Sequence, residues 1–265
     1  MKRLIIAPFK GEFDWEIMTY NPYLRYIAPN YDEVIAFCTK GKEYLYEFAD
    51  RCYETKGYNR GIWWTHNGKI TKIPAYPGLR RFDYDEVSPT KEVCLDWKHR
   101  KFRQLGEYRE DLHYDLVFHM RSVRRIGRMY KNWNLKGWGE ILDLLGNKYR
   151  IAAIGTEAAW FAGTEDKRNI PFKELCDLMR SSTLMVSPSS GPAFLAHLCG
   201  LPLITWSSKI KRNVHHHTDK QLHKRLWNPF RTQVTMQDQF RFSPAVRGVQ
   251  LAIIKNMKKL KELGC

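Results

Sequence analysis

This sequence has no closely spaced pair of cysteines, no long apolar run and no internal repeat. Its six cysteines form no Cys-x-x-Cys pair, and Cys38, Cys176 and Cys199 lie within apolar patterns. We therefore expect reduced thiols that pack as small core residues. No window is long enough to span a membrane, and residues 1–8 are too few for a signal peptide. These absences predict a cytoplasmic protein.

Acidic residues are scarce relative to basic ones. There are 28 Asp and Glu against 44 Lys and Arg, which gives a net charge of +16. A field of this size attracts anionic substrates or polyanions, although a solvated basic surface would carry the same charge. Aromatic residues make up 14% of the chain, which suits both core packing and stacking on sugars or bases. The 43% hydrophobic content excludes an intrinsically disordered chain.

Apolar patterns in the first half predict an alternation of strands and helices. Residues 4–7 and 33–38 are short apolar runs that indicate buried strands. A helix is expected up to about Ile27, disturbed by Pro22, and another over residues 41–53. Asn67-Gly68, between residues 61–65 and 69–73, predicts a hairpin.

The second half repeats the alternation more regularly. Strands are expected at residues 115–120, 149–154, 184–186 and 203–206. Helices are expected after Asn134, over 172–180 and 191–199 with Gly200 as the C-cap, and after Ser243-Pro244. Such an alternation predicts an α/β fold with parallel sheets and right-handed crossovers. We expect two Rossmann-like lobes over residues 1–112 and 113–243, followed by a C-terminal helix over 244–265.

Three segments of the second lobe follow predicted strands. They are Arg121-Ser122-Val123-Arg124-Arg125, Gly155-Thr156-Glu157 and Ser187-Pro188-Ser189-Ser190-Gly191-Pro192. In open parallel sheets, ligands bind beyond the carboxyl ends of the strands. The third segment also begins a helix, whose free N–H groups and positive dipole end suit a phosphate. An ordinary helix cap would use the same residues.

These segments also resemble a known family. Residues 131–138, 154–157 and 175–202, and above all 184–196, are similar to the C-terminal lobe of the heptosyltransferase-like glycosyltransferases. The resemblance implies a compact GT-B-like fold, in which two Rossmann-like lobes enclose a nucleotide-sugar donor. The chain departs from the family at Ser189, where an acidic residue is usual, and at Phe194, where a histidine is usual. The identity of the sugar therefore stays open.

The resemblance assigns roles to residues of the second lobe. Arg121 and Lys131 would face the donor diphosphate, which agrees with the way guanidinium and ammonium groups bind phosphate. Glu157 would accept hydrogen bonds from the ribose, although it could instead be a charge at a helix start. The remaining donor-site residues would be Gly155, Thr156, Ser189, Ser190, Gly191 and Pro192. The nucleotide sugar is a co-substrate, and no other cofactor is expected.

The catalytic base is expected on the loop after the first strand. Gly11-Glu12 lies where the family has a glycine and an acidic base, so Glu12 is the first candidate and Asp14 the second. Sugar transfer needs a carboxylate that takes the proton of the acceptor hydroxyl. Both residues could equally be solvated loop carboxylates.

No metal site is expected. Three consecutive histidines, residues 215–217, cannot all face one ion from a regular element. They lie in a basic loop that also contains Lys209, Lys211, Arg212, Lys220, Lys224 and Arg225.

The sequence thus predicts a metal-independent glycosyltransferase with an anionic acceptor, preferably a glycan or a lipid-linked glycan. A hydroxymethylated DNA base is an alternative acceptor, which would have to be flipped out of the stack. A non-catalytic nucleic-acid-binding protein on a degenerate transferase fold and a nucleotide-sugar epimerase are further alternatives.

Overall fold

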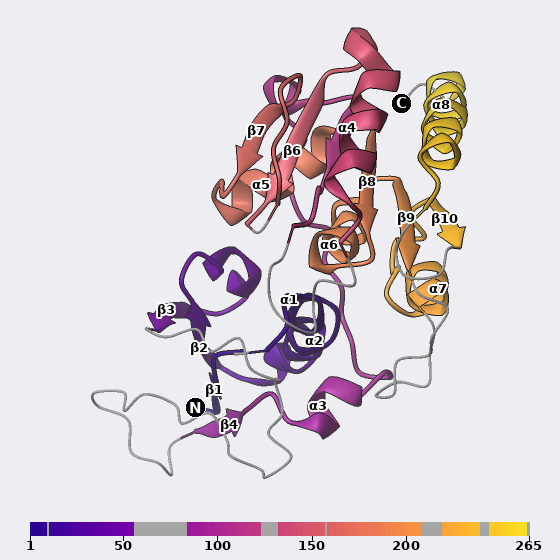
Figure 1. The fold of residues 1–265 in the computed structure, drawn as a ribbon. Coiled ribbons are helices and arrows are strands. Elements are labelled where there is room, and N and C mark those ends of the chain that lie inside the picture. Colours follow the sequence, from indigo (N-terminus) through magenta and orange to yellow (C-terminus); the bar gives the residue numbers. More distant parts are fainter. Residues whose placement is uncertain are drawn as a thin grey trace. The chain divides into compact units, whose positions relative to one another are not determined.

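Two separate parallel sheets organise the chain (Figure 1). The structure is a computed structural model, and it describes residues 1–9, 11–55, 84–122, 132–156, 158–207, 219–238 and 244–263. The chain divides into two compact units, residues 1–103 and 104–265. The α/β class, with one parallel sheet in each half, is confirmed.

The first unit contains a four-stranded sheet in the order β3-β2-β1-β4. Its strands are β1 (Arg3–Ile6), β2 (Glu33–Thr39), β3 (Arg51–Thr55) and β4 (Asp85–Val87), and all neighbours are parallel. The central strands β1 and β2 are almost fully buried, which explains their continuous apolar sequences.

Helical turns connect β1 to β2. They are α1 (Phe13–Trp15), the π-helical turn η1 (Glu16–Tyr20), α2 (Asn21–Ile27) and the 3₁₀ turn η2 (Ala28–Asn30). Pro22 lies in the first turn of α2, where a missing N–H is tolerated. The Tyr20 hydroxyl contacts the carbonyl oxygens of Ala7 and Val87 at 2.9 and 3.0 Å, which ties the ends of β1 and β4 together.

The helix predicted over residues 41–53 is wrong. This segment contains the 3₁₀ turn η3 (Glu43–Tyr46) and the first residues of β3. Asp50 and Val34 are joined by two hydrogen bonds, because the Asp50 N–H donates to the Val34 carbonyl and the Asp50 carboxylate accepts from the Val34 N–H. Pairing with β2 therefore outweighs the local helical spacing. The short helix α3 (Lys91–Leu95) follows β4, and the hairpin predicted at 61–73 lies outside the described residues.

The second unit contains a six-stranded parallel sheet in the order β10-β9-β8-β5-β6-β7. When these six strands are numbered 1 to 6 in chain order and read from β7, their order is 3-2-1-4-5-6, as in a Rossmann sheet. The strands are β5 (Leu116–Phe118), β6 (Ile151–Gly155), β7 (Glu165–Arg168), β8 (Leu184–Pro188), β9 (Leu203–Ser207) and β10 (Val234–Asp238).

Helices lie between these strands as the sequence predicts. The longer ones are α4 (Leu135–Leu145), α5 (Phe172–Ser181), α6 (Gly191–Cys199) and α8 (Val246–Glu262). The Asn134 side chain caps α4 by accepting from the Gly137 N–H at 2.5 Å. Gly200 ends α6 in the left-handed conformation, with φ of 72°. Shorter turns are η4 (Glu110–Leu112), η6 (Gly146–Lys148), α7 (Asp219–Gln221) and the π-helical η7 (Leu222–Leu226).

An aromatic cluster forms the centre of the second unit's core. Trp133 contacts Trp138 and Trp206 edge-on, with ring centroids 4.9 and 5.2 Å apart, and Phe118 packs on Trp138 at 5.6 Å. The apolar faces of α4 and α8 cover this side of the sheet. Helices α5 and α6 contact each other and contribute nothing to this cluster, so they cover the opposite face. Part of the aromatic surplus is therefore core packing.

Residues 104–112, which the sequence analysis placed in the first lobe, belong to the second unit. The Leu105 N–H donates to the Leu198 carbonyl, and the Arg109 N–H donates to the Ser181 hydroxyl at 2.7 Å. This segment is thus held by α5 and α6. Helix α8 belongs to the same unit, because its apolar stripe completes the core described above.

Candidate functional site

The strand order of the second sheet reverses between β5 and β8. Both strands end at the same edge, where His119 follows β5 and Ser189 follows β8. Ligands of doubly wound sheets bind at such a switch point, outside the carboxyl ends of the strands. The side chains around His119 are therefore the candidate site.

His119 is buried at this edge. Its Nδ1 lies 3.1 Å from the Ser190 hydroxyl and 3.3 Å from the Ser187 hydroxyl. Burial, with a smaller contribution from the nearby charge of Arg121, lowers the pKa of His119 to about 3. The imidazole is therefore neutral at physiological pH, and it can donate or accept a hydrogen bond without a charge of its own.

Gly155 lets β6 end directly against this imidazole. Its φ is 112°, a conformation that favours glycine, and a Cβ atom there would lie 2.7 Å from the His119 Cδ2. No larger residue fits without displacing the ring. Thr156, the next residue, is exposed at the same edge.

The first turn of α6 is open to a ligand. Ser190 holds the N-cap position, but its side chain does not cap the helix and instead contacts His119 and the Pro188 carbonyl. Within the described residues, the N–H groups of Gly191 and Ala193 have no protein partner. Pro192 has no N–H to offer. Free N–H groups at a helix start form an anion site.

Arg121 brings a positive charge to the same edge. Its side chain is mostly buried, and its guanidinium donates to the Asn132 side chain at 2.5 Å. Its backbone bridges to Ala158, in the loop after β6. The loops after β5 and β6 are thus fastened to each other beside His119.

Ser189 lies differently from Ser190. It is fully buried, and its hydroxyl is 3.0 Å from the Nε2 of His223. The His223 Nδ1 is 2.9 Å from the Nε2 of His197, and burial followed by the neighbouring His223 holds the pKa of His197 well below its ordinary value. The His223 ring stacks on Phe194 at 4.2 Å. Ser189 therefore belongs to a buried hydrogen-bonded chain with His223 and His197.

The structure brings together part of the predicted donor site. Arg121, Gly155, Ser190 and Gly191 lie around His119, while Lys131 and Glu157 lie outside the described residues, as do 208–218 with the histidine run. The sequence analysis missed His119 because it counted the residue as part of a strand. The available signal was one ionisable residue at the end of an apolar run.

The two candidate bases lie in the first unit. Glu12 holds the N-cap position of α1, at the carboxyl end of β1, but its side chain does not cap the helix. Asp14 is buried in the following turn. Glu16, which the sequence did not single out, is fully buried, forms an ion pair with Lys42 and accepts from the Tyr46 hydroxyl at 2.9 Å. Glu16 therefore stabilises this turn.

Over the described ranges, no three His, Cys, Asp or Glu residues are grouped as a metal site. Over the same ranges, no helix combines the length and apolar character needed to cross a bilayer.

Comparisons with known proteins found likeness in structure alone. No protein-family model matches the chain, and no curated protein matches it significantly. A family 9 glycosyltransferase from Veillonella parvula superposes with a TM-score of 0.58 at 11% identity, covering 97% of each chain. E. coli ADP-heptose LPS heptosyltransferase II gives 0.57 at 10% identity, covering 98% of this chain and 100% of the other.

The chain has a heptosyltransferase-like GT-B fold. Heptosyltransferase WaaC of E. coli, solved with ADP, gives a TM-score of 0.51 at 14% identity and covers 98% and 99% of the two chains. TibC of enterotoxigenic E. coli, described as an iron-containing dodecameric glycosyltransferase, gives 0.51 at 14% identity. This chain is matched over 77% of its length and TibC over 58%.

The buried, neutral state of His119 predicts a pH dependence of stability. Its pKa falls from an ordinary 6.5 to about 3 on folding, so the unfolded chain binds a proton between these values and the folded chain does not. Stability should therefore fall as the pH is lowered from 6.5 towards 3, by about 1.4 kcal/mol per pH unit from this residue. Urea unfolding at a series of pH values should show a shallower dependence for His119→Asn. The control is His113→Asn, which removes a ring that contacts the Thr183 hydroxyl at 3.1 Å, and equal slopes in both variants would contradict the assignment.

Proposed function

We propose that the protein is a glycosyltransferase that moves a sugar from a nucleotide-sugar donor to a hydroxyl of an anionic glycan or lipid-linked glycan. The observation that carries this proposal is the open start of α6 beside Ser190, His119 and Arg121 at the switch point of the second sheet. The heptosyltransferase-like fold supports the same reaction class.

The donor diphosphate would bind at the start of α6. The N–H groups of Gly191 and Ala193 and the helix dipole attract its oxygens, and Arg121 adds a full positive charge. Lys131 would also face the diphosphate, Glu157 would accept hydrogen bonds from the ribose, and Gly155 and Thr156 would line the donor site. Stabilising the negative charge that develops on the departing diphosphate is the main catalytic contribution of such a site.

The acceptor hydroxyl would lose its proton to a carboxylate of the first unit. Its oxygen attacks the anomeric carbon, the bond from that carbon to the diphosphate breaks, and the carboxylate receives the proton. Glu12 is the proposed base because it follows β1, at the carboxyl end of the first sheet. Asp14, the second candidate, is more deeply buried.

The net charge of +16 supports an anionic acceptor. Heptosyltransferase II, one of the similar structures, is described as acting on lipopolysaccharide. A DNA base as acceptor gains no support from the similar structures. Donor turnover with and without an acceptor distinguishes a transferase from a pure binder and from an epimerase.

Donor binding is tested by thermal shift with UDP-, GDP-, ADP- and CMP-sugars. One of these should raise the melting temperature, and Arg121→Gln should weaken its binding by about tenfold to a hundredfold, the value of a hydrogen bond to a charged group. Gly191→Val should abolish the shift by blocking the start of α6. Arg247→Gln, which removes the same charge at an exposed position of α8, is the control. Absence of any shift at millimolar nucleotide sugar would exclude this donor site.

The base is tested by Glu12→Gln. Turnover should fall by about a hundredfold or more, because an amide cannot accept the proton, while donor affinity should be unchanged. Asp14→Asn is the matched comparison. If Asp14→Asn lowers turnover and Glu12→Gln does not, Asp14 is the base, and if neither does, the loop after β1 is not catalytic.

We also propose that transfer needs no metal ion. Activity should therefore survive EDTA, measured as donor turnover. TibC is described as iron-containing, and this chain has an Asp-x-Asp sequence at 83–85, of which Asp85 is hydrogen-bonded to Tyr31. Loss of turnover in EDTA that added Mn²⁺ or Fe²⁺ restores would contradict metal independence.

A further inference from the structure

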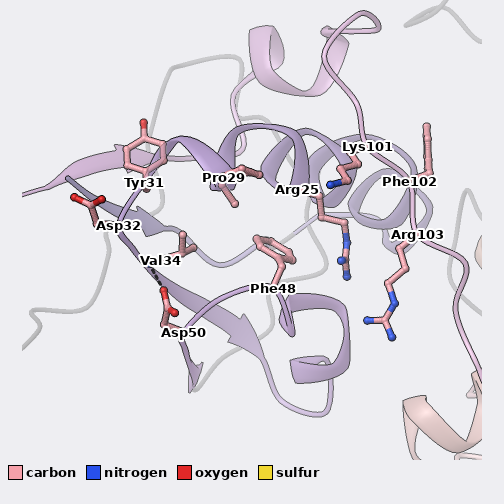
Figure 2. A pocket seen from close by; sticks show the side chains of 11 residues that line it. Arg25, Pro29, Tyr31, Asp32, Val34, Phe48, Asp50, Lys101, Phe102 and Arg103 are labelled. Carbon is pink, nitrogen blue, oxygen red and sulfur yellow. Dashed lines mark hydrogen bonds between the residues drawn. The ribbon is translucent and has the colours of Figure 1, made fainter. Parts of the chain in front are cut away.

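A pocket of about 510 Å³ opens in the first unit (Figure 2). Asp32 directly precedes β2 and Asp50 directly precedes β3, so the pocket lies at the amino ends of these strands. Glu12 follows β1 at the carboxyl end of the same parallel sheet. The pocket is therefore separate from the proposed catalytic edge.

Three cationic side chains line one side of the pocket. Arg25, Lys101 and Arg103 lie together there, as Figure 2 shows. Arg25 and Arg103 both form ion pairs with Glu47, and Arg25 also donates to the Leu45 carbonyl. The Lys101 ammonium has no partner among the described residues. Lys101 is exposed, so its ammonium is accessible to an external anion.

Two carboxylates lie on the other side. Asp50 accepts the Val34 N–H through Oδ2 at 2.7 Å, and Asp32 accepts the Lys2 N–H through Oδ2 at 2.6 Å. The Oδ1 atoms of both have no protein partner within the described part of the chain. Both side chains are exposed and keep one oxygen for a donor group, although the N-terminal ammonium lies 4.0 Å from the Asp32 Oδ2.

Apolar surface separates the two sides. Val34, Pro29 and the half-buried ring of Phe48 lie between the cations and the carboxylates in Figure 2. The pocket therefore presents, in order, a cationic group, an apolar face and two hydrogen-bond acceptors. Its volume lies within the range of small-ligand sites.

We propose that this pocket binds an anionic saccharide, with its phosphate or carboxylate at Lys101, an apolar ring face against Pro29 and Val34 and hydroxyls donating to Asp50 and Asp32. The Arg25 guanidinium lies over the Phe48 ring, 4.8 Å from its centroid. A nucleic acid fits poorly, because Asp32 and Asp50 would repel the next phosphates of a continuous polyanion. A neutral sugar would leave Lys101 unused. The proposal does not rest on the donor site, since it concerns a binding site at the opposite edge of a different sheet.

Binding can be measured by calorimetry on the full chain with glucose 6-phosphate, glucose and inorganic phosphate as probes. Glucose 6-phosphate should bind more tightly than either of the others, since only it carries both the anion and the hydroxyls. Lys101→Gln should weaken its binding by up to about fivefold, the upper end of the range for an exposed ion pair. Asp50→Asn should weaken it about tenfold, while keeping an acceptor for the Val34 N–H.

Controls separate this site from the surface charge and from the proposed active site. Lys98→Gln, the same charge change at an exposed position of the first unit, should leave the affinity unchanged, as should Arg121→Gln and Glu12→Gln. The proposal is overturned if inorganic phosphate binds as tightly as glucose 6-phosphate. It is also overturned if Lys98→Gln matches Lys101→Gln, if Arg121→Gln or Glu12→Gln abolishes binding, or if no probe binds at 20 mM, roughly the weakest affinity expected of such a pocket.

Discussion

The carboxyl edge of the second sheet is built around one buried imidazole. His119 comes from β5, and its Nδ1 contacts hydroxyls of Ser187 and Ser190 from the end of β8. Because Ser190 is turned towards His119, it does not cap α6, and the first N–H groups of that helix stay open. Gly155 at the end of β6 must remain a glycine for the same ring to fit. Three strands and one helix start therefore depend on the burial of this neutral side chain.

Strands were predictable where both faces are buried. The central strands β1, β2, β5, β6 and β8 are continuous apolar runs, because a parallel strand covered on both faces needs apolar side chains throughout. The edge strand β7 has the sequence Glu-Asp-Lys-Arg, and β3 is mostly exposed. Their positions depend on backbone pairing with a neighbour, which leaves no signal in the side-chain pattern.

Part of the candidate site was predictable from a local sequence motif. A strand followed by Ser-Ser-Gly-Pro and a helix indicates an anion site on local grounds. Which of the two serines faces the site depends on the pleat of the strand end, and only the structure shows that Ser190 contacts His119 while Ser189 contacts His223. The net charge was also ambiguous. Burial lowers the pKa of Arg100 to about 10, and its guanidinium donates to three backbone carbonyls. This arginine therefore stabilises the fold as well as adding to the positive charge of the protein.

Ser189 and Phe194, where heptosyltransferase-like sequences usually have an acidic residue and a histidine, both contact His223. The ring of His223 stacks on Phe194 and reaches the Ser189 hydroxyl, while its other nitrogen meets His197. The His197 Nδ1 has no partner and is buried, so it is best left as a bare acceptor, with the proton on Nε2 directed at His223. With this tautomer of His197, His223 accepts at Nδ1 and can donate from Nε2 to the Ser189 hydroxyl. Under the proposed function, a donor phosphate at the start of α6 would meet no negative charge from this chain, so sugar recognition here would rest on neutral hydrogen bonds where the family usually has a carboxylate.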